Sequence, residues 1–125
     1  MAMAMEEALR ARLQAQLAAP VDWGWNQQGE AVPRIVLTLV SDIPAYSMDG
    51  PSDMARARVQ IDCFAASQGA VIHLARAVTA AISGYATAPL LGVFLDGGID
   101  LPPDTTAGEV FARRTLSAMV HHRIP

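Results

Sequence analysis

The run Met48-Asp-Gly-Pro-Ser-Asp-Met-Ala-Arg-Ala-Arg-Val-Gln-Ile-Asp-Cys-Phe-Ala-Ala-Ser67 holds a turn, an alternating segment and a helix start in one continuous stretch. Asp49, Gly50 and Pro51 are turn residues, because glycine tolerates positive φ and proline fixes φ near the value a turn needs. Apolar and polar side chains then alternate, which predicts a strand with one dry face and one polar face. The dry face carries Ala55, Ala57, Val59, Ile61 and Cys63, and the polar face carries Arg56, Arg58, Gln60, Asp62 and Phe64.

Two segments on either side of this strand have helical periodicity. Met5, Leu9, Leu13 and Leu17 recur every four residues and predict a helix over about 3–18, which a proline at position 20 ends. The second helix starts at Ser67, a suitable N-cap, and ends near Gly84. Its apolar stripe consists of Val71, Leu74, Ala75, Val78 and Ile82.

Four more segments are predicted strands: 21–25, 34–41, 91–101 and 110–122. Trp23 and Trp25 share one side of the first and mark either a core edge or a subunit contact. Asp96-Gly97-Gly98 interrupts the third as a bulge or a tight turn. The order α-β-β-β-α-β-β predicts a single α+β domain over residues 1–125, with a mostly antiparallel sheet and both helices packed on one face.

Two connections are predicted to be loops. Residues 42–54 form a link longer than most hairpin turns, and 102–108 are rich in proline, threonine and glycine. Tyr46, Met48 and Met54 are apolar residues in the first of these loops. They pack either on a neighbouring subunit or back on their own domain.

Composition narrows the class of protein. The net charge is −3 and all nine basic residues are arginine, which argues against a dedicated nucleic-acid binder. No run reaches the roughly 18 apolar residues of a membrane span, and the N-terminus lacks the basic region of a secretory signal. With a single cysteine, Cys63, no internal disulfide framework forms, and we expect a protein made in the cytoplasm.

No pattern of catalytic or ligand-binding residues emerges. The glycines at 97 and 98 lack phosphate-loop spacing, and Asp96, Asp100 and Asp104 are too widely spaced for an EF-hand. Consecutive residues of a strand point to opposite faces, so His121 and His122 cannot share a metal. With Arg123 they are predicted to form a cluster at the surface or at an interface. We therefore expect no cofactor, no metal and no enzymatic activity.

The polar face of the central strand is the most informative surface. Arg56, Arg58, Gln60 and Asp62 project together, and either Arg113 or Arg114 joins them if the last strand pairs with this one. Guanidinium groups suit bidentate contacts to carboxylates across an interface. The alternative is a solvated outer face with weak ion pairs.

The quoted run closely resembles the tail-completion (tail-terminator) family of long-tailed bacteriophages, prophages and gene transfer agents. Segments 33–41 (Pro-Arg-Ile-Val-Leu-Thr-Leu-Val-Ser) and 92–97 (Gly-Val-Phe-Leu-Asp-Gly) agree with it. The resemblance implies a structural virion protein at the head–tail junction, assembled in the bacterial cytoplasm. Members of that family form a homo-oligomeric ring, generally six-fold, that caps the tail tube protein and meets head-completion or connector proteins.

The same resemblance implies that DNA passes through the lumen of the ring without specific binding, and a net-negative protein is consistent with that. The candidate interface consists of Tyr46, Met48, Asp49, Met54, Arg56, Arg58, Asp62, Arg113 and Arg114. The alternative function is a small cytoplasmic α+β module that binds a small molecule or a protein partner, with a small-molecule pocket between sheet and helices.

Overall fold

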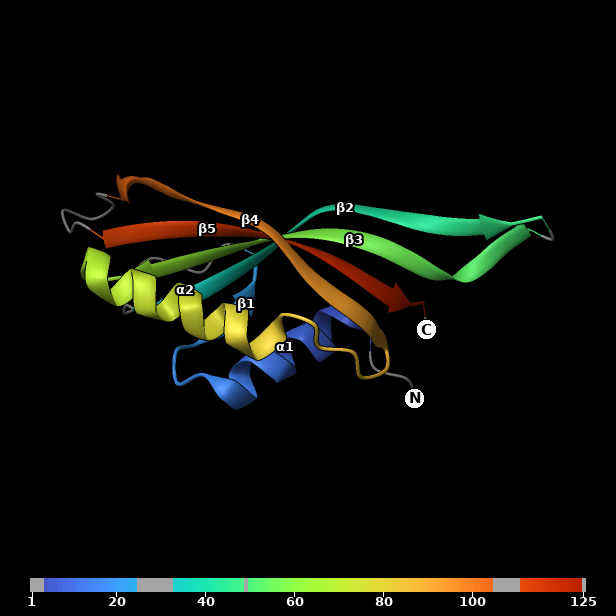
Figure 1. Cartoon of the computed structure of the whole chain (residues 1–125), viewed down its shortest axis with the longest axis horizontal. Coiled ribbons are helices and arrows are strands. Elements are labelled where there is room, and N and C mark those ends of the chain that lie inside the picture. The colour runs from blue at the N-terminus through green and yellow to red at the C-terminus, as the bar shows by residue number, and fades with distance from the viewer. Residues whose placement is uncertain (1–3, 25–32, 49, 105–110, 125) are drawn as a thin grey trace.

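The computed structural model describes residues 4–24, 33–48, 50–104 and 111–124. Figure 1 shows the helices beneath a twisted sheet. The predicted order α-β-β-β-α-β-β is confirmed: the elements are α1 (Met5–Gln16), β1 (Val21–Trp23), β2 (Arg34–Ser47), β3 (Gly50–Ala65), α2 (Gln68–Ile82), β4 (Leu90–Asp104) and β5 (Phe111–Arg123).

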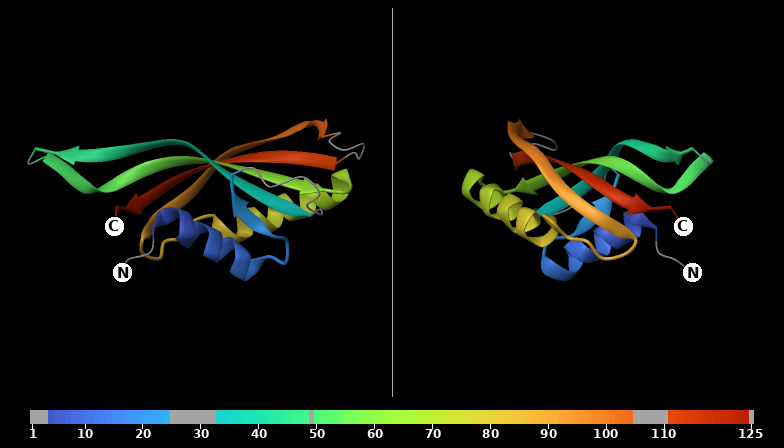
Figure 2. Two further views of the ribbon diagram at one scale, coloured as in Figure 1. Left: turned by 180° about the vertical axis from the view of Figure 1, so that it is seen from behind. Right: turned by 45° about the vertical axis from the view of Figure 1, so that its right-hand side comes forward.

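The sheet has the strand order β1-β2-β3-β5-β4, so the strand with the strict alternation lies at its centre. β1 runs parallel to β2, and the other neighbours are antiparallel, as predicted. Both helices lie on the same face of the sheet (Figures 1 and 2). We call this the inner face and the opposite side the outer face.

The core forms between the inner face and the helices. The dry side of β3 is buried throughout, and Met5, Leu9 and Leu13 of α1 and Val71, Val78 and Ile82 of α2 are buried with it in one cluster. A fully buried aliphatic side chain of this size stabilises the fold by about 1.5–3 kcal/mol. The indole Nε1 of Trp23 donates to the carbonyl of Glu6 over 2.8 Å, which makes Trp23 a core-edge residue, whereas Trp25 lies outside the described residues.

Local signals define the ends of α2. The Ser67 hydroxyl accepts a hydrogen bond from the amide of Ala70 at 3.1 Å, so the predicted N-cap is confirmed. The helix ends at Ile82, two residues before Gly84, whose φ of +75° is favourable only for glycine. None of the described helices is long and apolar enough to span a membrane.

β2 and β3 continue as a two-stranded ribbon past the rest of the sheet. The prediction of a loop over 42–54 is therefore wrong, because the ladder runs on from Asp42↔Ala57 to Ser47↔Gly50. Register shifts between Leu39 and Ser41, and again between Pro44 and Tyr46, break the alternation that would have indicated a strand. We call residues 42–54 the arm, and Figure 1 shows that it extends beyond the helices.

β4 is continuous through its glycines. A register shift between Leu95 and Gly97 shows that the interruption is a bulge and not a turn. A Cβ at Gly98 would lie only 2.7 Å from Cδ2 of Leu116, so a larger residue there would displace the Leu116 side chain. The predicted loop over 102–108 is wrong for 102–104, which belong to β4, and 105–108 lie outside the described residues.

Candidate protein interface: the arm and the outer sheet face

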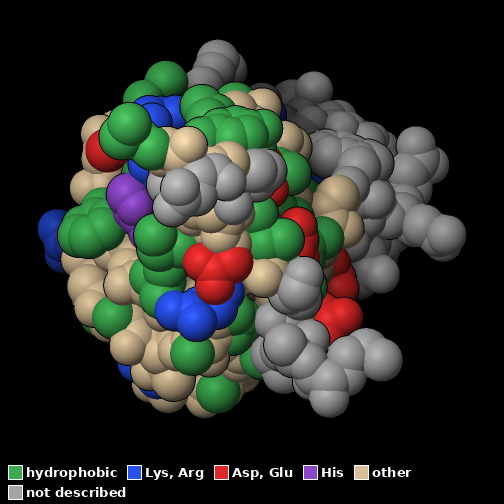
Figure 3. All heavy atoms as spheres, turned by 90° about the vertical axis from the view of Figure 1, so that its right-hand side faces the viewer, with side chains coloured by type: hydrophobic (Ala, Val, Ile, Leu, Met, Phe, Trp, Pro, Cys, Tyr) green, Lys and Arg blue, Asp and Glu red, His purple; other side chains and the backbone are tan. Residues whose placement is uncertain are grey.

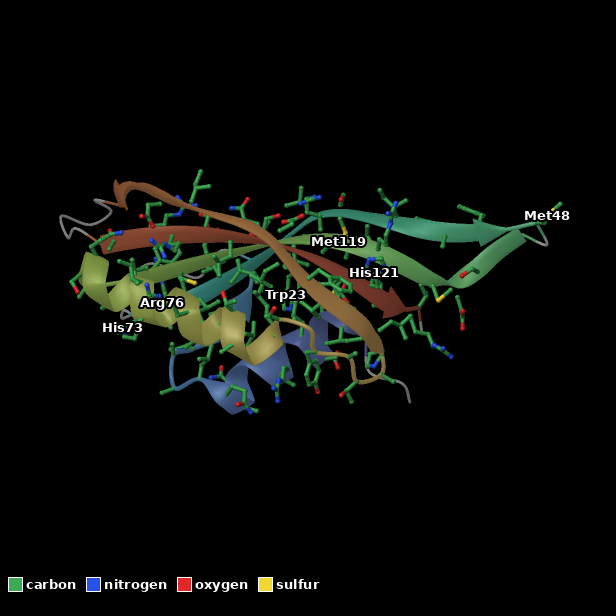
Figure 4. The ribbon with its side chains drawn as sticks, viewed as in Figure 1. Trp23, Met48, His73, Arg76, Met119 and His121 are labelled. Carbon is green, nitrogen blue, oxygen red and sulfur yellow. The ribbon has the colours of Figure 1, made fainter. Side chains whose placement is uncertain are left out.

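The arm exposes large apolar side chains. Tyr46 is 70% exposed and Met48 is 105% exposed, while Ile43 and Met54 are 54% and 43% exposed. Tyr46, Met48 and Met54 therefore do not pack back on their own domain, and Asp49 lies outside the described residues. Figure 4 shows Met48 at the far tip of the arm, and Figure 3, which faces the arm end, shows hydrophobic side chains at that surface. Large exposed apolar patches mark interaction sites in soluble proteins.

A buried histidine and a partly exposed aspartate hold the base of the arm. Nε2 of His122 lies 3.0 Å from Oδ1 of Asp42, and the His122 side chain is only 6% exposed. In the sheet, Asp42 of β2 pairs with Ala57 of β3, and His122 of β5 pairs with Ala55 of β3. The pair thus connects β2 to β5 across β3.

The prediction that both histidines lie at the surface is wrong for His122, which the inner-face register buries. His121 points to the outer face, as the alternation requires, and its ring packs edge-on against Phe94 with centroids 5.5 Å apart. Phe94 is 55% exposed, so this contact lies at the surface.

Arg58 forms an in-chain network in the middle of the outer face. Its Nη1 donates to Oδ2 of Asp96 at 2.7 Å and to the hydroxyl of Ser117 at 2.9 Å. Hydrogen bonds from Arg58 and then from Ser117 hold the pKa of Asp96 below its ordinary value. Both charged side chains are more than a third exposed, so the pair contributes little to stability.

Asp62 lies at the centre of a second, more buried network. It is 4% exposed and accepts hydrogen bonds from Thr115 (2.6 Å), Arg113 (3.2 Å) and Gln60 (3.1 Å). The guanidinium groups of Arg113 and Arg34 lie 5.4 and 4.7 Å from the ring centroid of Phe64. Of the two arginines that could join the polar face, it is Arg113 that does so.

Arg114 lies on the inner side of the sheet, since it pairs with Cys63 in the ladder. Its Nε and Nη2 donate to the two carboxylate oxygens of Asp100 at 2.5 and 3.1 Å, and Gln68 donates to Asp100 at 3.2 Å. The hydrogen bond from Arg114 lowers the pKa of Asp100. Arg114 therefore links the sheet to the start of α2 and is not part of the outer face.

Arg56 differs from these arginines. It is exposed on the outer face between Ile43 and His121, its ladder neighbours on β2 and β5. Within the described part of the chain it has no hydrogen-bond or ion-pair partner. Its guanidinium is therefore available to a partner from outside the chain.

Two further kinds of site, a reactive cysteine and a metal centre, were considered for the described residues. Burial, and then the charge of Asp62, raises the pKa of the Cys63 thiol to about 12, which makes it a poor nucleophile. Over the described residues, no group of three or more His, Cys, Asp or Glu side chains could hold a metal ion.

The described residues line two surface hollows. One lies on the outer face at the bulge of β4, and the other, of about 360 Å³, lies between α1 and residues 85–89. Neither lies between the sheet and the helices, where a buried apolar cluster fills the space.

Comparison with known proteins gives two findings. The model of a family described as "Tail completion protein gp17" matches residues 4–111. A chain of the solved structure described as "Virion of native gene transfer agent (GTA) particle" is similar, with a TM-score of 0.67 and 16% identity over 96% of this chain and 95% of that one. At that identity the likeness shows a shared fold. No curated protein matches the chain.

Proposed function

The chain belongs to the family of tail completion proteins described as gp17, and we propose that copies of it close into a ring, generally six-fold, that caps the tail tube and joins tail to head. The family resemblance seen in the sequence is confirmed by that match. A tail completion protein is a structural component of a tail. The ring, its stoichiometry and its partners are the proposal.

The arm is the observation that carries this proposal. A ring built from identical copies needs two different complementary surfaces on each copy, since every subunit contacts the next one head to tail. A ribbon that projects past the helices and exposes Tyr46 and Met48 suits one of them. Tyrosine and methionine are enriched at the centres of protein interfaces, and a solitary subunit gains nothing from exposing them.

The charges of the sheet support the role of the ring as a conduit. Arg58, Arg113 and Arg114 each pair with an aspartate of the same chain, so these arginines do not combine into a basic surface. DNA affinity depends mainly on basic groups that replace phosphate counterions. DNA passing through the lumen of such a ring would meet little specific attraction. The proposed location is the virion at the head–tail junction, after assembly in the bacterial cytoplasm.

The alternative function is a small α+β module that binds a small molecule or a protein partner, with a small-molecule pocket between sheet and helices. The buried apolar cluster occupies that space.

The experiment combines the purified chain with the tail tube protein and examines the product by negative-stain electron microscopy. We expect rings and tubes of defined length with capped ends. The double variant Tyr46→Ser/Met48→Ser should keep its melting temperature and lose rings and caps, because both side chains are exposed. His73→Ser is the matched control, since His73 is exposed on α2 at the opposite end of the molecule from Met48 (Figure 4).

One result would overturn the proposal. If the wild-type chain stays monomeric at high concentration and also never associates with tube ends, it is not a capping ring. Monomers in dilute solution without tubes do not count against it, because the tube end can act as the template for ring closure.

A further inference from the structure

The surface around Arg56 is more apolar than a sheet face that only meets solvent. Ile43, its ladder neighbour, and Met54, on the same face of β3, are 54% and 43% exposed, and Phe94, which packs against its other ladder neighbour His121, is 55% exposed. The other arginines of β3 and β5 each form an ion pair with an aspartate of the same chain. The pairs are Arg58–Asp96, Arg113–Asp62, Arg114–Asp100 and Arg123–Asp53. An arginine within an exposed apolar patch is the composition typical of an interface centre, and it calls for a carboxylate on the partner.

A second surface of the same chain has the complementary properties. The groove between α1 and residues 85–89 has a floor of Ala8, Ala11 and Ala15 and walls that include Tyr85 and Pro89. Its volume of about 360 Å³ is enough for one or two large apolar side chains. Arg12 also lines the groove: its Nε donates to the carbonyl of Ala81 at 2.8 Å, and its guanidinium lies 4.4 Å from the Tyr85 ring centroid.

A carboxylate residue precedes the first residue that lines this groove, Ala8. Glu7 is exposed in the first turn of α1, one helical turn before Ala11. Within the described residues Glu7 has no hydrogen-bond or ion-pair partner, whereas the aspartates at 22, 42, 53, 62, 96 and 100 each have one. The groove therefore combines an apolar hollow with an available anion. The arm carries exposed apolar side chains, and Arg56, two residues beyond its end on β3, adds an available cation.

We propose that the arm of one copy docks in the α1 groove of the next copy, with Arg56 paired to Glu7. This inference rests on the proposed ring and names the second of the two surfaces that the ring requires. The two surfaces differ, so the contact is head to tail and repeats from copy to copy. Figures 1 and 2 show the arm extending beyond the helix layer that holds the groove, so that it is presented to another molecule.

Charge reversal tests the pairing. Arg56→Glu and Glu7→Arg should each weaken self-association by roughly tenfold or more, because each places like charges together in the contact. The variant carrying both changes should recover most of the loss. Sedimentation velocity measures the association, and melting temperatures establish that the variants fold. Arg76→Glu is the control, because Arg76 is exposed on α2 away from both surfaces (Figure 4).

Disulfide cross-linking tests the geometry. Met54→Cys and Ala11→Cys are made in separate preparations, since both positions are exposed. Oxidation of the mixture should give a mixed dimer, whereas each variant alone should give far less. Cys63 is buried and does not compete. Replacing Ala11→Cys by Arg76→Cys should abolish the mixed product.

The outcomes separate the two proposals. If both charge-reversal variants associate as the wild type does and no mixed dimer forms, the groove is not the receptor, while the ring stands. If Arg56→Glu still forms rings but no longer caps tubes, the Arg56 surface binds another tail protein and this inference is wrong. A wild-type chain that forms neither rings nor caps overturns both.

Discussion

Replacing Asp62 by alanine should destabilise the fold more than any other single change on the outer face. Asp62 is 4% exposed and receives hydrogen bonds from Thr115, Arg113 and Gln60. A hydrogen bond to a charged group contributes about 1.5–3 kcal/mol, but Arg113 and Gln60 are partly exposed and can return to water. We therefore expect a loss of about 3 kcal/mol in the free energy of unfolding, which is less than the sum of three such hydrogen bonds.

Urea unfolding followed by circular dichroism measures this loss, and the melting temperature should fall by roughly 10 °C. Asp62→Asn keeps the shape and one acceptor oxygen, so it should cost about 2 kcal/mol. Asp96→Ala is the matched control, because it removes a carboxylate from an exposed ion pair on the same face and should cost less than about 1 kcal/mol. If Asp62→Ala and Asp96→Ala are equally destabilising, the argument from burial is refuted.

Four further predictions follow from other contacts. Arg58→Ala should leave the monomer folded and impair assembly of rings or capped tubes, and unchanged assembly would favour a purely solvated role for this side chain. Asp96 and Asp100 have lowered pKa values, so the stability they add is present above the ordinary value of 3.8 and is lost as pH falls through their folded pKa; replacing both by asparagine should flatten the decline of stability below about pH 4, and an unaltered acid limb would contradict this. Cys63, with a pKa of about 12, should resist iodoacetamide at pH 8 in the native protein and react after unfolding, as mass spectrometry will show; rapid native labelling would mean that the site opens. Ser67→Ala should remove the N-cap of α2 and lower the free energy of unfolding by about 1 kcal/mol in a urea titration, and no change would show that solvent replaces the cap.

The sequence was sufficient for the elements that obey a single period. The stripe of α2 and the strict alternation of β3 each place nearly every residue on the face where the structure has it. The cap at Ser67 was predictable too, because it depends only on residues adjacent in the chain.

The arm was missed because two register shifts and Pro44 remove the alternation over the second half of β2. A strand whose period is broken by bulges is indistinguishable from a loop when each residue is considered alone. The ladder partners on β3 restore the pattern, and they become visible only once the hairpin is formed.

Contacts that depend on the register of strand pairing could not be predicted from the sequence. Whether Arg113 or Arg114 faces Asp62 is decided by a shift of one residue in the pairing of β5 with β3. The pairing of Asp42 with His122 joins residues 80 positions apart, and nothing local in either segment indicates it. That Arg56, within the described residues, has no ion-pair partner while the other arginines of β3 and β5 each have one could likewise be seen only from the strand pairing.

The Asp42–His122 pair has a consequence for how the arm meets its partner. A flexible ribbon would lose conformational entropy on docking, and that loss would reduce the affinity. Because the pair ties β2 to β5 across two alanines of β3, the base of the arm is already ordered in the free subunit. Less of the interaction energy is then spent on ordering the arm, so individually weak contacts contribute more to the net affinity between copies in the proposed ring.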